Sequence, residues 1–328
     1  MWAWWCDQPV GVDALTWRET PTPQPGPGQV LVAIEAAGLN FPDLLIAEGK
    51  YQIKPPLPFV PGAEYAGRIE AVGDGVALLR PGQRVACLSG TGGFATHTLA
   101  PAELCLPLPD DFAAADAAAF IMTYATSHHA LIDRGQLRAG ETVLVLGAAG
   151  GVGTAAIQIA KAAGARVVAA ASSADKCALC ASLGADATID YGASGVSGLR
   201  DAIRAQCGAG GPDVIYDPVG GDLAEPAFRS IAWRGRYLVI GFAAGTIPSL
   251  PLNLPLLKGA SLIGVFWGEF AKREPRANAA MLTELAGWYA QGKVKPVVQT
   301  ALPMSQLKDA CARLAGRAVK GKLVLVNG

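Results

Sequence analysis

The 328-residue sequence lacks any uninterrupted apolar run that approaches the roughly 20 residues needed to cross a bilayer. Its first residues, MWAWWCDQPV, also lack a basic leader and a long apolar segment before Asp7, which is unlike a secretory signal. Although 51% of the residues are hydrophobic, these two absences predict a soluble protein that has no membrane partner and resides in the cytoplasm.

The sequence also lacks an excess of either charge. It contains 27 Lys and Arg residues and 27 Asp and Glu residues, so no overall field would attract nucleic acid or an anionic membrane. Its seven cysteines stand at irregular positions, which favours free thiols in a reducing compartment over a disulfide framework. We therefore expect no nucleic-acid partner, and we expect any recognition of charge to be local.

Patterns of metal ligands are scarce. Cys177 and Cys180 form C-x-x-C, a spacing that zinc sites use, but a structural zinc needs four ligands and the sequence has no second pair. His128 and His129 are adjacent and would project about 100° apart on a helix, so they cannot easily share one ion. His97 lies alone in a predicted strand. We predict that the protein binds no metal.

What the sequence does contain is a change of pattern near residue 110. Up to about Pro109, short β-prone runs such as QVLVAIEAAG and AEYAGRIEAVG are separated by Pro and Gly, which predicts a β-rich, barrel-like unit. Farther along, apolar strands such as TVLVLG, RVVAAA and DVIYDPVG alternate with helical patterns, which is typical of a parallel sheet covered on both faces. A chain of this length has room for two such domains.

A glycine-rich segment, GAAGGVG at residues 147–153, follows one of these strands and leads into the helical pattern TAAIQIAKAAG. Glycines at such a turn let backbone amides approach a pyrophosphate at a helix N-terminus. Compared with the pattern G-x-G-x-x-G, Ala148 replaces the first glycine, whereas Gly150 and Gly153 keep the other two places. The alternative is a tight turn without a ligand. We expect the dinucleotide to contact Ala149, Gly150, Gly151 and Val152.

The next strand ends without an acidic residue. Enzymes that use NAD usually carry an Asp or Glu about 20 residues beyond the glycines, where it holds the adenosine ribose, but residues 170–173 read AASS. Hydroxyl groups and a cation suit a 2′-phosphate, so Ser172, Ser173 and Lys176 predict NADPH, and Tyr191, taken as the end of the third strand, is expected beside the same phosphate. The alternative makes Ser173 a helix N-cap and Lys176 a solvated charge.

A family resemblance rests on five segments that occur in order along the chain: AAGLNFPDLLIAEGKY, PFVPGAEYAGRIEAVGDGV, GAAGGVGTAAIQIAKAAGA, LGADATIDY and VIYDPVGG. With them the sequence resembles the zinc-free quinone oxidoreductase (zeta-crystallin-like) branch of the medium-chain dehydrogenase/reductase superfamily. The resemblance implies an α/β protein with a GroES-like, β-rich catalytic domain (residues 1–118 and 266–328). It also implies a Rossmann domain with a doubly wound parallel sheet (residues 119–265), which binds NADPH.

The resemblance also implies a homodimer or homotetramer. Subunits of this branch are often joined through an edge strand of the Rossmann sheet, and SLIGVFW is the candidate strand here. An apolar edge strand that is left uncovered invites association, so the expectation has a physical basis as well.

Catalytic candidates follow from the same resemblance. In the zinc-dependent relatives a cysteine stands at the position of Asn40, a histidine stands at that of Ala63 before Glu64, and a four-cysteine structural lobe is present that this sequence lacks. Tyr51 matches a cleft tyrosine and is the expected hydrogen-bond donor to the substrate. Asn40 and Asp43 are expected to position substrate or water. The alternatives are that Asn40 and Asp43 satisfy loop amides and that Tyr51 only packs.

Further cofactor contacts are implied by the resemblance alone. Thr123 is expected near the nicotinamide ribose or amide, and residues 266–268 are expected to face the nicotinamide. Phe242 and Trp267 are equally expected as ordinary core residues. The complete set of these further contacts is Thr123, Asp217, Val219, Gly241, Phe242, Ala243, Phe266, Trp267, Gly268 and Lys322.

The chemistry expected of this site is hydride transfer from the nicotinamide to an electrophilic carbon. Without zinc, hydrogen bonds must stabilise the oxygen that gains charge, which favours conjugated acceptors that delocalise that charge. The expected function is NADPH-dependent reduction of a small-molecule quinone. Two alternatives stay open, namely NADPH-dependent reduction of the C=C bond of an enone, enal or enoyl thioester, and a nucleotide-binding protein with little turnover.

Overall fold

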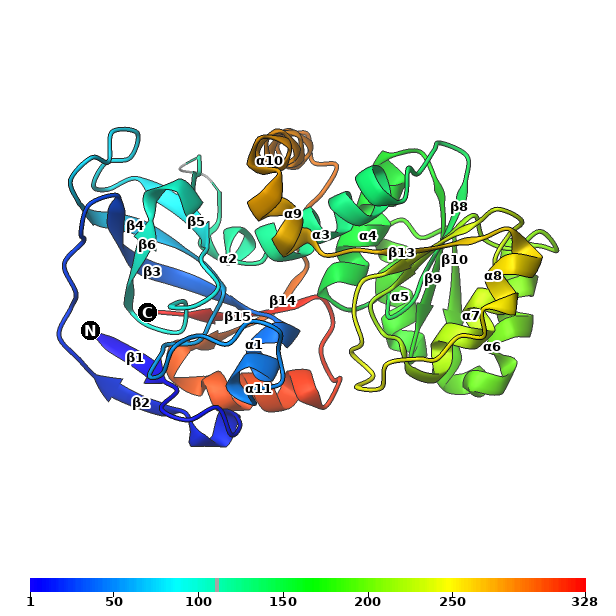
Figure 1. Ribbon diagram of the computed structural model, residues 1–328, viewed down its shortest axis with the longest axis horizontal. Helices are drawn as coiled ribbons and strands as arrows, with labels where there is room; N and C mark the ends of the chain where they lie inside the picture. The colour runs from blue at the N-terminus through cyan, green and yellow to red at the C-terminus, as the bar shows by residue number, and fades with distance from the viewer. Residues whose placement is uncertain (110–111) are drawn as a thin grey trace. The chain divides into compact units, whose positions relative to one another are not determined.

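The computed structural model describes residues 1–109 and 112–328. These residues form two compact units, of which the first comprises Met1–Met122 with Pro296–Gly328 and the second Thr123–Lys295. Both ends of the chain therefore contribute to the first unit (Figure 1). Sequence analysis assigned residues 266–295 to the first domain, whereas the structure places them in the second unit. The reason is local packing, because Phe270 stacks on His129 and Trp288 lies against His128.

The first unit is built on a mixed seven-stranded sheet. Its strands follow the order β14-β15-β3-β4-β5-β7, and β6 pairs with β3. Every pair is antiparallel except β14 with β15. The strands are β3 (Gln29–Leu39), β4 (Glu64–Val72), β5 (Arg84–Leu88), β6 (His97–Pro101), β7 (Cys105–Pro107), β14 (Val298–Pro303) and β15 (Lys322–Val326), with a separate antiparallel pair, β1 (Trp2–Trp5) and β2 (Thr16–Glu19).

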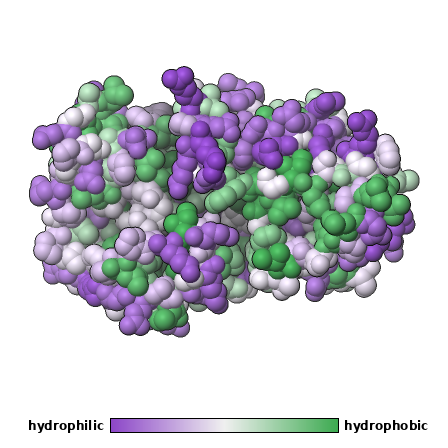
Figure 2. All heavy atoms as spheres, viewed as in Figure 1, coloured by the Kyte–Doolittle hydropathy of each residue, from purple (hydrophilic) through white to green (hydrophobic). Residues whose placement is uncertain are grey.

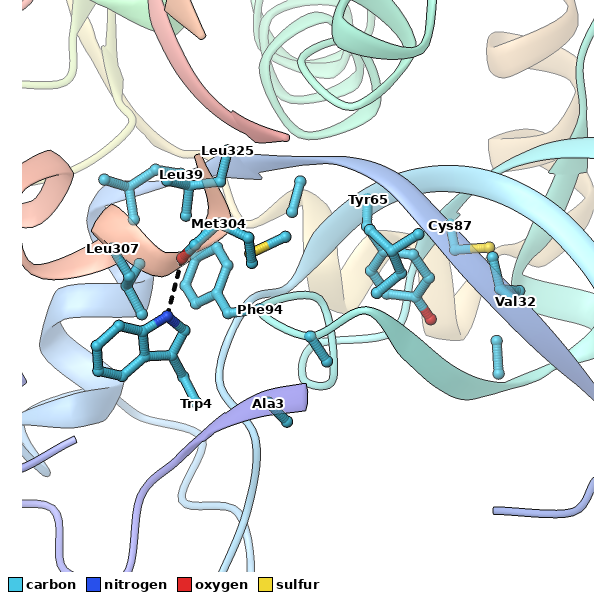
Figure 3. Close-up of a cluster of buried hydrophobic side chains, with 14 of the residues drawn as sticks. Ala3, Trp4, Val32, Leu39, Tyr65, Cys87, Phe94, Met304, Leu307 and Leu325 are labelled. Atoms are coloured by element: carbon cyan, nitrogen blue, oxygen red, sulfur yellow. Dashed lines mark hydrogen bonds between the residues drawn. The ribbon is translucent and has the colours of Figure 1, made fainter. Parts of the chain in front are cut away.

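The core of the first unit joins segments that are far apart in the sequence. Figure 3 shows the Trp4 side chain against Met304 and Leu307, and the Trp4 indole N–H donates to the Met304 carbonyl at 2.9 Å. Phe94, Tyr65 and Leu325 are fully or almost fully buried in the same cluster. The helices of this unit are α1 (Phe41–Ala47), α2 (Ala114–Ala117) and α11 (Leu307–Ala315), with the 3-10 turns η1 (Val12–Ala14), η2 (Ala102–Leu104) and η6 (Met304–Gln306).

The second unit contains a six-stranded parallel sheet in the order β10-β9-β8-β11-β12-β13 (Figure 1). The central strands are almost wholly buried because helices cover both faces of such a sheet. The strand order reverses direction between β8 and β11, and ligands of doubly wound folds bind at this position. The predicted α/β class is confirmed. The strands are β8 (Thr142–Val145), β9 (Arg166–Ala171), β10 (Ala187–Asp190), β11 (Val214–Asp217), β12 (Arg236–Val239) and β13 (Ser261–Gly264).

Helices surround this parallel sheet. One face is packed by a cluster in which Leu199 and Phe228 meet Ile215 of β11. The helices are α3 (Thr126–His128), α4 (Gly151–Ala162), α5 (Ala174–Ser182), α6 (Tyr191–Cys207), α7 (Ala224–Arg229), α8 (Asn253–Lys258), α9 (Trp267–Arg273) and α10 (Pro275–Ala290), with a 3-10 turn η5 (Gly221–Leu223) and two π-helical segments, η3 (Ile121–Ala125) and η4 (His129–Arg134). Among the described residues, no helix combines the length and apolar character that a membrane span requires.

Candidate functional site

The glycine-rich turn joins β8 to α4 at the carboxyl end of β8. Gly147 adopts a φ of +58°, which favours glycine. A Cβ at Gly153 would lie 2.5 Å from the Gly147 carbonyl oxygen and 2.7 Å from Ala148 Cα, so this helix position also requires glycine. Gly150 is the N-cap of α4, and its nearest neighbour would be 3.4 Å from an added Cβ. Two of the glycines are therefore required by the turn itself, and Gly150 is not.

The N-terminus of α4 fits a phosphate group. No side chain caps this end of the helix, and its first turn contains no acidic residue. The backbone N–H groups of this first turn can donate to an anionic ligand, and the helix dipole also favours an anion there. The predicted residues Ala149, Gly150, Gly151 and Val152 all lie at this turn or in the first turn of α4. The turn could therefore hold the pyrophosphate of a dinucleotide.

The end of β9 carries the residues predicted to distinguish NADPH from NADH. Lys176 Nζ donates to Ser172 Oγ at 3.0 Å, and Ser173 caps α5 by accepting the Lys176 backbone N–H at 3.4 Å. Ser173 is therefore the helix N-cap, as one interpretation expected. The cap does not exclude a phosphate site, because the Ser172 hydroxyl and the Lys176 ammonium still lie side by side. Together they could contact a phosphate with one hydroxyl and one cation.

Tyr191 belongs to a helix, and the expectation that it ends a strand is wrong. β10 stops at Asp190, whose carboxylate accepts the backbone N–H groups of Gly192 and Ala193 and so starts α6. The beginning of α6 nevertheless lies against the end of β9, because a Cβ at Gly192 would come within 2.3 Å of the Ser172 carbonyl oxygen. Tyr191 precedes this contact and packs against the core of the second unit, and its place beside the phosphate stays a prediction.

The loops after β11 and β12 are bonded to each other. Asp217 is buried and accepts the backbone N–H groups of Val219 and Gly220 at 2.8 and 2.9 Å. The Ala243 N–H donates to the Pro218 carbonyl. The structure thus brings the predicted residues Asp217, Val219, Gly241 and Ala243 together at the carboxyl edge of the sheet. The Asp217 carboxylate holds the loop, and burial raises its pKa.

The predicted aromatic contacts differ in exposure. Phe242 and Phe266 are 37% and 52% exposed, whereas Trp267 is buried and its indole N–H donates to Asn278 Oδ1 at 2.9 Å. Of the two residues that were equally expected as core, Trp267 is core and Phe242 is not. Gly268 follows Trp267 in α9, and Thr123 is buried in η3.

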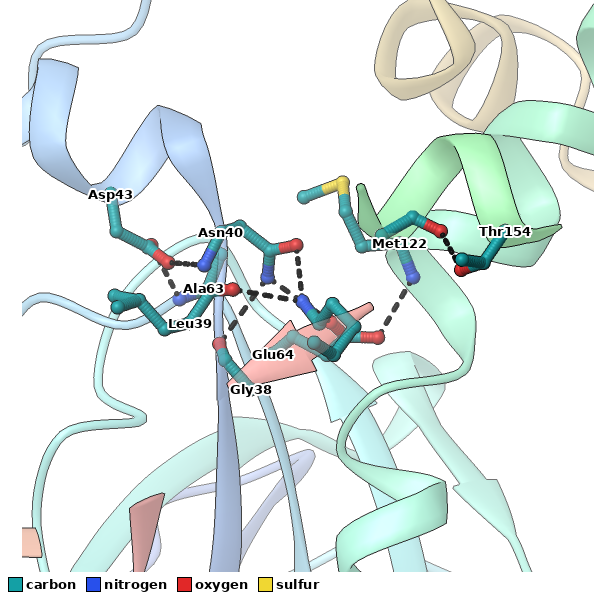
Figure 4. Close-up of polar contacts among 10 residues, drawn as sticks. Gly38, Leu39, Asn40, Asp43, Ala63, Glu64, Met122 and Thr154 are labelled. Carbon is teal, nitrogen blue, oxygen red and sulfur yellow. Dashed lines mark hydrogen bonds and ion pairs between the residues drawn. The ribbon is translucent and has the colours of Figure 1, made fainter. Parts of the chain in front are cut away.

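A buried polar cluster lies in the first unit, where β3, β4 and β15 meet (Figure 4). The Lys322 ammonium donates to the Leu39 carbonyl at 3.0 Å, to Asn40 Oδ1 at 2.6 Å and to Glu64 Oε2 at 3.3 Å. Lysine has three donors, and each has one partner here. The Lys322 ammonium thus joins Asn40 to Glu64, and the predicted approach of Lys322 to the cofactor stays a prediction.

The Asn40 amide and the Glu64 carboxylate complete this cluster. Asn40 Nδ2 donates to the Gly38 carbonyl and to Glu64 Oε2, and Glu64 Oε1 accepts the Met122 backbone N–H at 2.8 Å. The Asn40 donors are thus used within the protein, as in the interpretation that Asn40 serves the loop. Sequence analysis gave no role to Glu64. The signal in the sequence was a charged residue within the predicted strand AEYAGRIEAVG, and in the structure Glu64 of β4 pairs with Gly38 of β3, which brings its carboxylate beside Asn40.

Asp43 stands beside this cluster at the start of α1. Its carboxylate accepts the Asn40 N–H at 2.8 Å and the Ala63 N–H at 3.1 Å (Figure 4). Burial raises the pKa of Asp43 to about 7, although the two amides and the Lys322 ammonium favour the charged form. Asp43 therefore positions the loop between β3 and α1 and can change its charge near neutral pH.

We expect the pH dependence of stability to reveal this carboxyl group. Between about pH 4 and pH 7, folded Asp43 keeps a proton that the unfolded chain has lost, so wild-type stability falls as pH rises. The full difference is about 4 kcal/mol, at about 1.4 kcal/mol per pKa unit. Urea unfolding of wild type and Asp43→Asn across this range should show the difference shrinking as pH rises. Curves that run parallel would contradict the buried, proton-binding role.

Tyr51 differs from the other two catalytic candidates. Its ring packs against the core of the first unit, and its hydroxyl has no hydrogen-bond partner among the described residues. Burial raises the pKa of Tyr51, and the Asp43 carboxylate raises it further. The hydroxyl is therefore protonated at neutral pH and can donate a hydrogen bond to a ligand.

The described residues contain no group of three or more His, Cys, Asp or Glu side chains that could hold a metal ion. Cys177 and Cys180 are both buried in α5. His128 and His129 are each within 3.2 Å of a carboxylate, that of Glu284 and that of Asp133 respectively.

Comparison with known proteins shows where the chain belongs. Residues 26–110 match the alcohol dehydrogenase GroES-like domain, and residues 151–284 match the zinc-binding dehydrogenase family. The quinone oxidoreductase-like protein 2 of Mus musculus is 35% identical over 312 residues, which cover 95% of this chain and 88% of that protein. The chain belongs to the zinc-independent quinone oxidoreductase branch of the medium-chain dehydrogenase/reductase superfamily. The predicted family is confirmed, and the protein is an oxidoreductase of this superfamily.

Other members of the superfamily agree with this placement. The quinone oxidoreductase of Rattus norvegicus is 34% identical over 93% of this chain and 91% of its own length. A solved mycobacterial structure complexed with NADPH is 31% identical with a TM-score of 0.92, and a probable oxidoreductase from Mycobacterium abscessus is 38% identical with a TM-score of 0.89. The CurK enoyl reductase is 25% identical with a TM-score of 0.88. Each structural match covers 99% or more of this chain and 98% or more of the other.

Proposed function

We propose that this oxidoreductase uses NADPH to reduce a small conjugated acceptor, preferably a quinone. The observation that carries the proposal is the end of β9, where Ser172 and Lys176 are bonded to each other and residues 170–173 include no acid. The uncapped N-terminus of α4 would hold the pyrophosphate. The similar mycobacterial structure that contains NADPH supports the same choice of cofactor.

The protein's own residues have defined tasks in this reaction. NADPH, when bound, supplies the hydride. The amides of the glycine turn bind its phosphates, and Ser172 with Lys176 recognises the 2′-phosphate. Tyr51 donates a hydrogen bond to the acceptor oxygen that gains negative charge, because its hydroxyl has no other partner among the described residues. Asn40 and Asp43 hold the loop before α1 and so position Tyr51 indirectly. Their direct contact with substrate stays a prediction.

The alternative acceptor is the C=C bond of an enone, enal or enoyl thioester. Its support is the likeness to the CurK enoyl reductase. A thioester carrier brings phosphate groups that need cations, and near Tyr51 the chain offers Lys50 and Lys54. Lys50 is paired with Glu48 at 3.0 Å, which leaves Lys54 as the cation there without an ion pair among the described residues. This arrangement favours a free small molecule over a thioester.

The proposal is tested by following NADPH oxidation with benzoquinone, naphthoquinone, an enone and crotonyl-CoA, each compared with NADH as donor. Turnover of a quinone with NADPH preferred is the expected result. Preference for crotonyl-CoA or the enone would assign the protein to the alternative reaction. Tight binding of NADPH without oxidation by any acceptor would instead indicate a nucleotide-binding protein with little turnover.

Reversing the charge at Lys176 should separate the two coenzymes. Lys176→Glu places a carboxylate beside Ser172, where it would repel a 2′-phosphate and accept ribose hydroxyls. We expect KM for NADPH to rise tenfold or more, on the order of 1.4 kcal/mol, while KM for NADH changes little. Arg200→Glu, on the exposed side of α6, is the matched charge reversal and should leave both values unchanged. Equal effects on the two coenzymes would refute the assignment of the 2′-phosphate site.

The oligomeric state is part of the same proposal. β13 is an edge strand of the parallel sheet, and its Leu262 is 42% exposed. The predicted strand SLIGVFW is shorter in the structure, ending at Gly264. Leu252, just before α8, and Leu256 and Leu257, within it, are also exposed, and Figure 2 shows hydrophobic residues gathered on the face of the second unit that it displays. A homodimer or homotetramer joined at β13 would cover them. A monomer in sedimentation equilibrium would overturn this assembly. The cytoplasmic location stays a prediction.

A further inference from the structure

Two adjacent buried residues end strand β11, next to the position where the strand order reverses. Tyr216 is completely buried and Asp217 is 3% exposed. Successive side chains of a strand point to opposite faces of the sheet, so the two polar groups reach different elements. Asp217 holds the loop that follows β11, as described above. Tyr216 reaches toward α3 and α4.

The Tyr216 hydroxyl takes part in a short chain of hydrogen bonds. Ser127 Oγ lies 2.9 Å from the Tyr216 hydroxyl and donates to the Val152 carbonyl at 3.0 Å. Serine has one hydroxyl hydrogen, so when that hydrogen goes to Val152 the Tyr216 hydroxyl must donate to Ser127. The chain therefore runs from Tyr216 through Ser127 to the second residue of α4. Val152 lies in the helical turn whose amides face the proposed phosphate site.

The glycine turn after β8 and the loop after β11 flank the position where the strand order reverses, and they lie close together. A Cβ at Gly147, in the glycine turn, would lie 2.6 Å from Val219 Cγ2, in the loop held by Asp217. Only glycine at position 147 therefore lets the two loops lie this close together. The end of β11 fixes both loops, one through each of its last two side chains.

We propose that Tyr216 and Ser127 are positioning residues for the dinucleotide, which hold the first turn of α4 where its amides meet the phosphates. This inference rests on the proposed function, because it assumes that α4 binds NADPH. The two hydroxyls are fully buried, and residues of similar shape without them, Phe and Ala, would fill most of the same space. Packing alone would not require the two consecutive hydrogen bonds from Tyr216 to Ser127 and from Ser127 to the Val152 carbonyl.

The test measures NADPH binding by fluorescence titration, together with steady-state kinetics, for Tyr216→Phe, Ser127→Ala and the double variant. We expect Kd for NADPH to rise about three- to tenfold in Ser127→Ala and less in Tyr216→Phe, which keeps the bond to Val152. The double variant should match Ser127→Ala because the residues act in series. kcat at saturating NADPH and KM for the acceptor should stay within about twofold, since the chain acts on binding.

Tyr65→Phe provides the matched control. It also removes one buried tyrosine hydroxyl, bonded to Ser89 Oγ at 3.1 Å, but in the first unit. It should lower thermal stability as Tyr216→Phe does without changing Kd for NADPH. If Tyr216→Phe and Ser127→Ala lose stability but bind NADPH like wild type, the positioning role is refuted. If the wild-type protein itself fails to bind NADPH, the proposed function fails first, and the two failures are thereby distinguished.

Discussion

Replacing Lys322 with methionine should lower the free energy of unfolding by about 3 to 5 kcal/mol, the cost of breaking a buried ion pair from one side. Lys322 is 5% exposed, and Glu64 is completely buried. Methionine fills the space of the aliphatic part of lysine but removes all three N–H donors. The Glu64 carboxylate would then keep only its bonds to Asn40 Nδ2 and to the Met122 N–H. Urea unfolding at pH 7 measures the loss.

Adding Glu64→Gln to Lys322→Met tests whether the unpaired buried charge causes the loss of stability. In the double variant Lys322→Met/Glu64→Gln both charges are gone, and the new side-chain amide oxygen can still accept the Met122 N–H, so we expect part of the stability to return. Lys161→Met is the matched exposed case, because its partner Asp186 is at 2.8 Å and both side chains are about one-third exposed. It should cost about 1 kcal/mol or less. Equal losses at Lys161 and Lys322 would rule out the buried-charge explanation.

Alanine at Gly150 should mainly weaken NADPH binding, whereas alanine at Gly153 should mainly lower the free energy of unfolding. At Gly150 the nearest atom to an added Cβ is 3.4 Å away and the backbone is ordinary, so Gly150→Ala should fold with a loss below about 1 kcal/mol. Its methyl group would nevertheless stand where the backbone must approach a pyrophosphate. We expect Kd for NADPH to rise about 10- to 100-fold, equivalent to roughly 1.4 to 2.8 kcal/mol.

Gly153→Ala should instead damage the turn itself. Its methyl group would meet the Gly147 oxygen and the Ala148 backbone at 2.5 to 2.7 Å, and backbone atoms cannot move away cheaply. We expect a loss of about 1 to 3 kcal/mol in stability, with weaker NADPH binding as a consequence. Paired urea unfolding and fluorescence titration distinguish the two variants. Normal NADPH binding by Gly150→Ala would remove the turn from the cofactor site.

The elements that sequence reasoning predicted well are those set by local pattern. The strands β8, β9 and β11 each contain a run of apolar, largely β-branched or small residues, and the turn before α4 is dense in glycine, so their type follows from neighbours in the sequence. Tyr191 was placed on the wrong side of the boundary between β10 and α6. The Asp190 carboxylate starts α6 by accepting backbone N–H groups from residues beyond Tyr191. A side chain that starts a helix and one that ends a strand look alike in the sequence.

The candidate site likewise divides into residues that the local sequence predicts and residues whose partners are distant in the sequence. Ser172 and Lys176 could be predicted because they follow β9 directly, at a fixed distance from the glycines. The partners of Lys322 could not be predicted, since Glu64 and Asn40 are 258 and 282 residues away along the chain. Ser127 and Tyr216 gave no signal either, because a serine in a helix and a tyrosine in an apolar strand are ordinary core residues until their hydroxyls meet.

The sequence by itself determined the class of the fold, the glycine turn before α4 and the hydroxyl and ammonium groups at the end of β9, because periodicity, glycine and charge act over a few neighbouring residues. Only the tertiary structure decided which polar groups are already engaged. Burial makes an unpaired donor or charge costly, so Asn40, Asp43 and Lys322 bond to each other or to nearby backbone, whereas the partly exposed Tyr51 has a hydroxyl without a partner among the described residues.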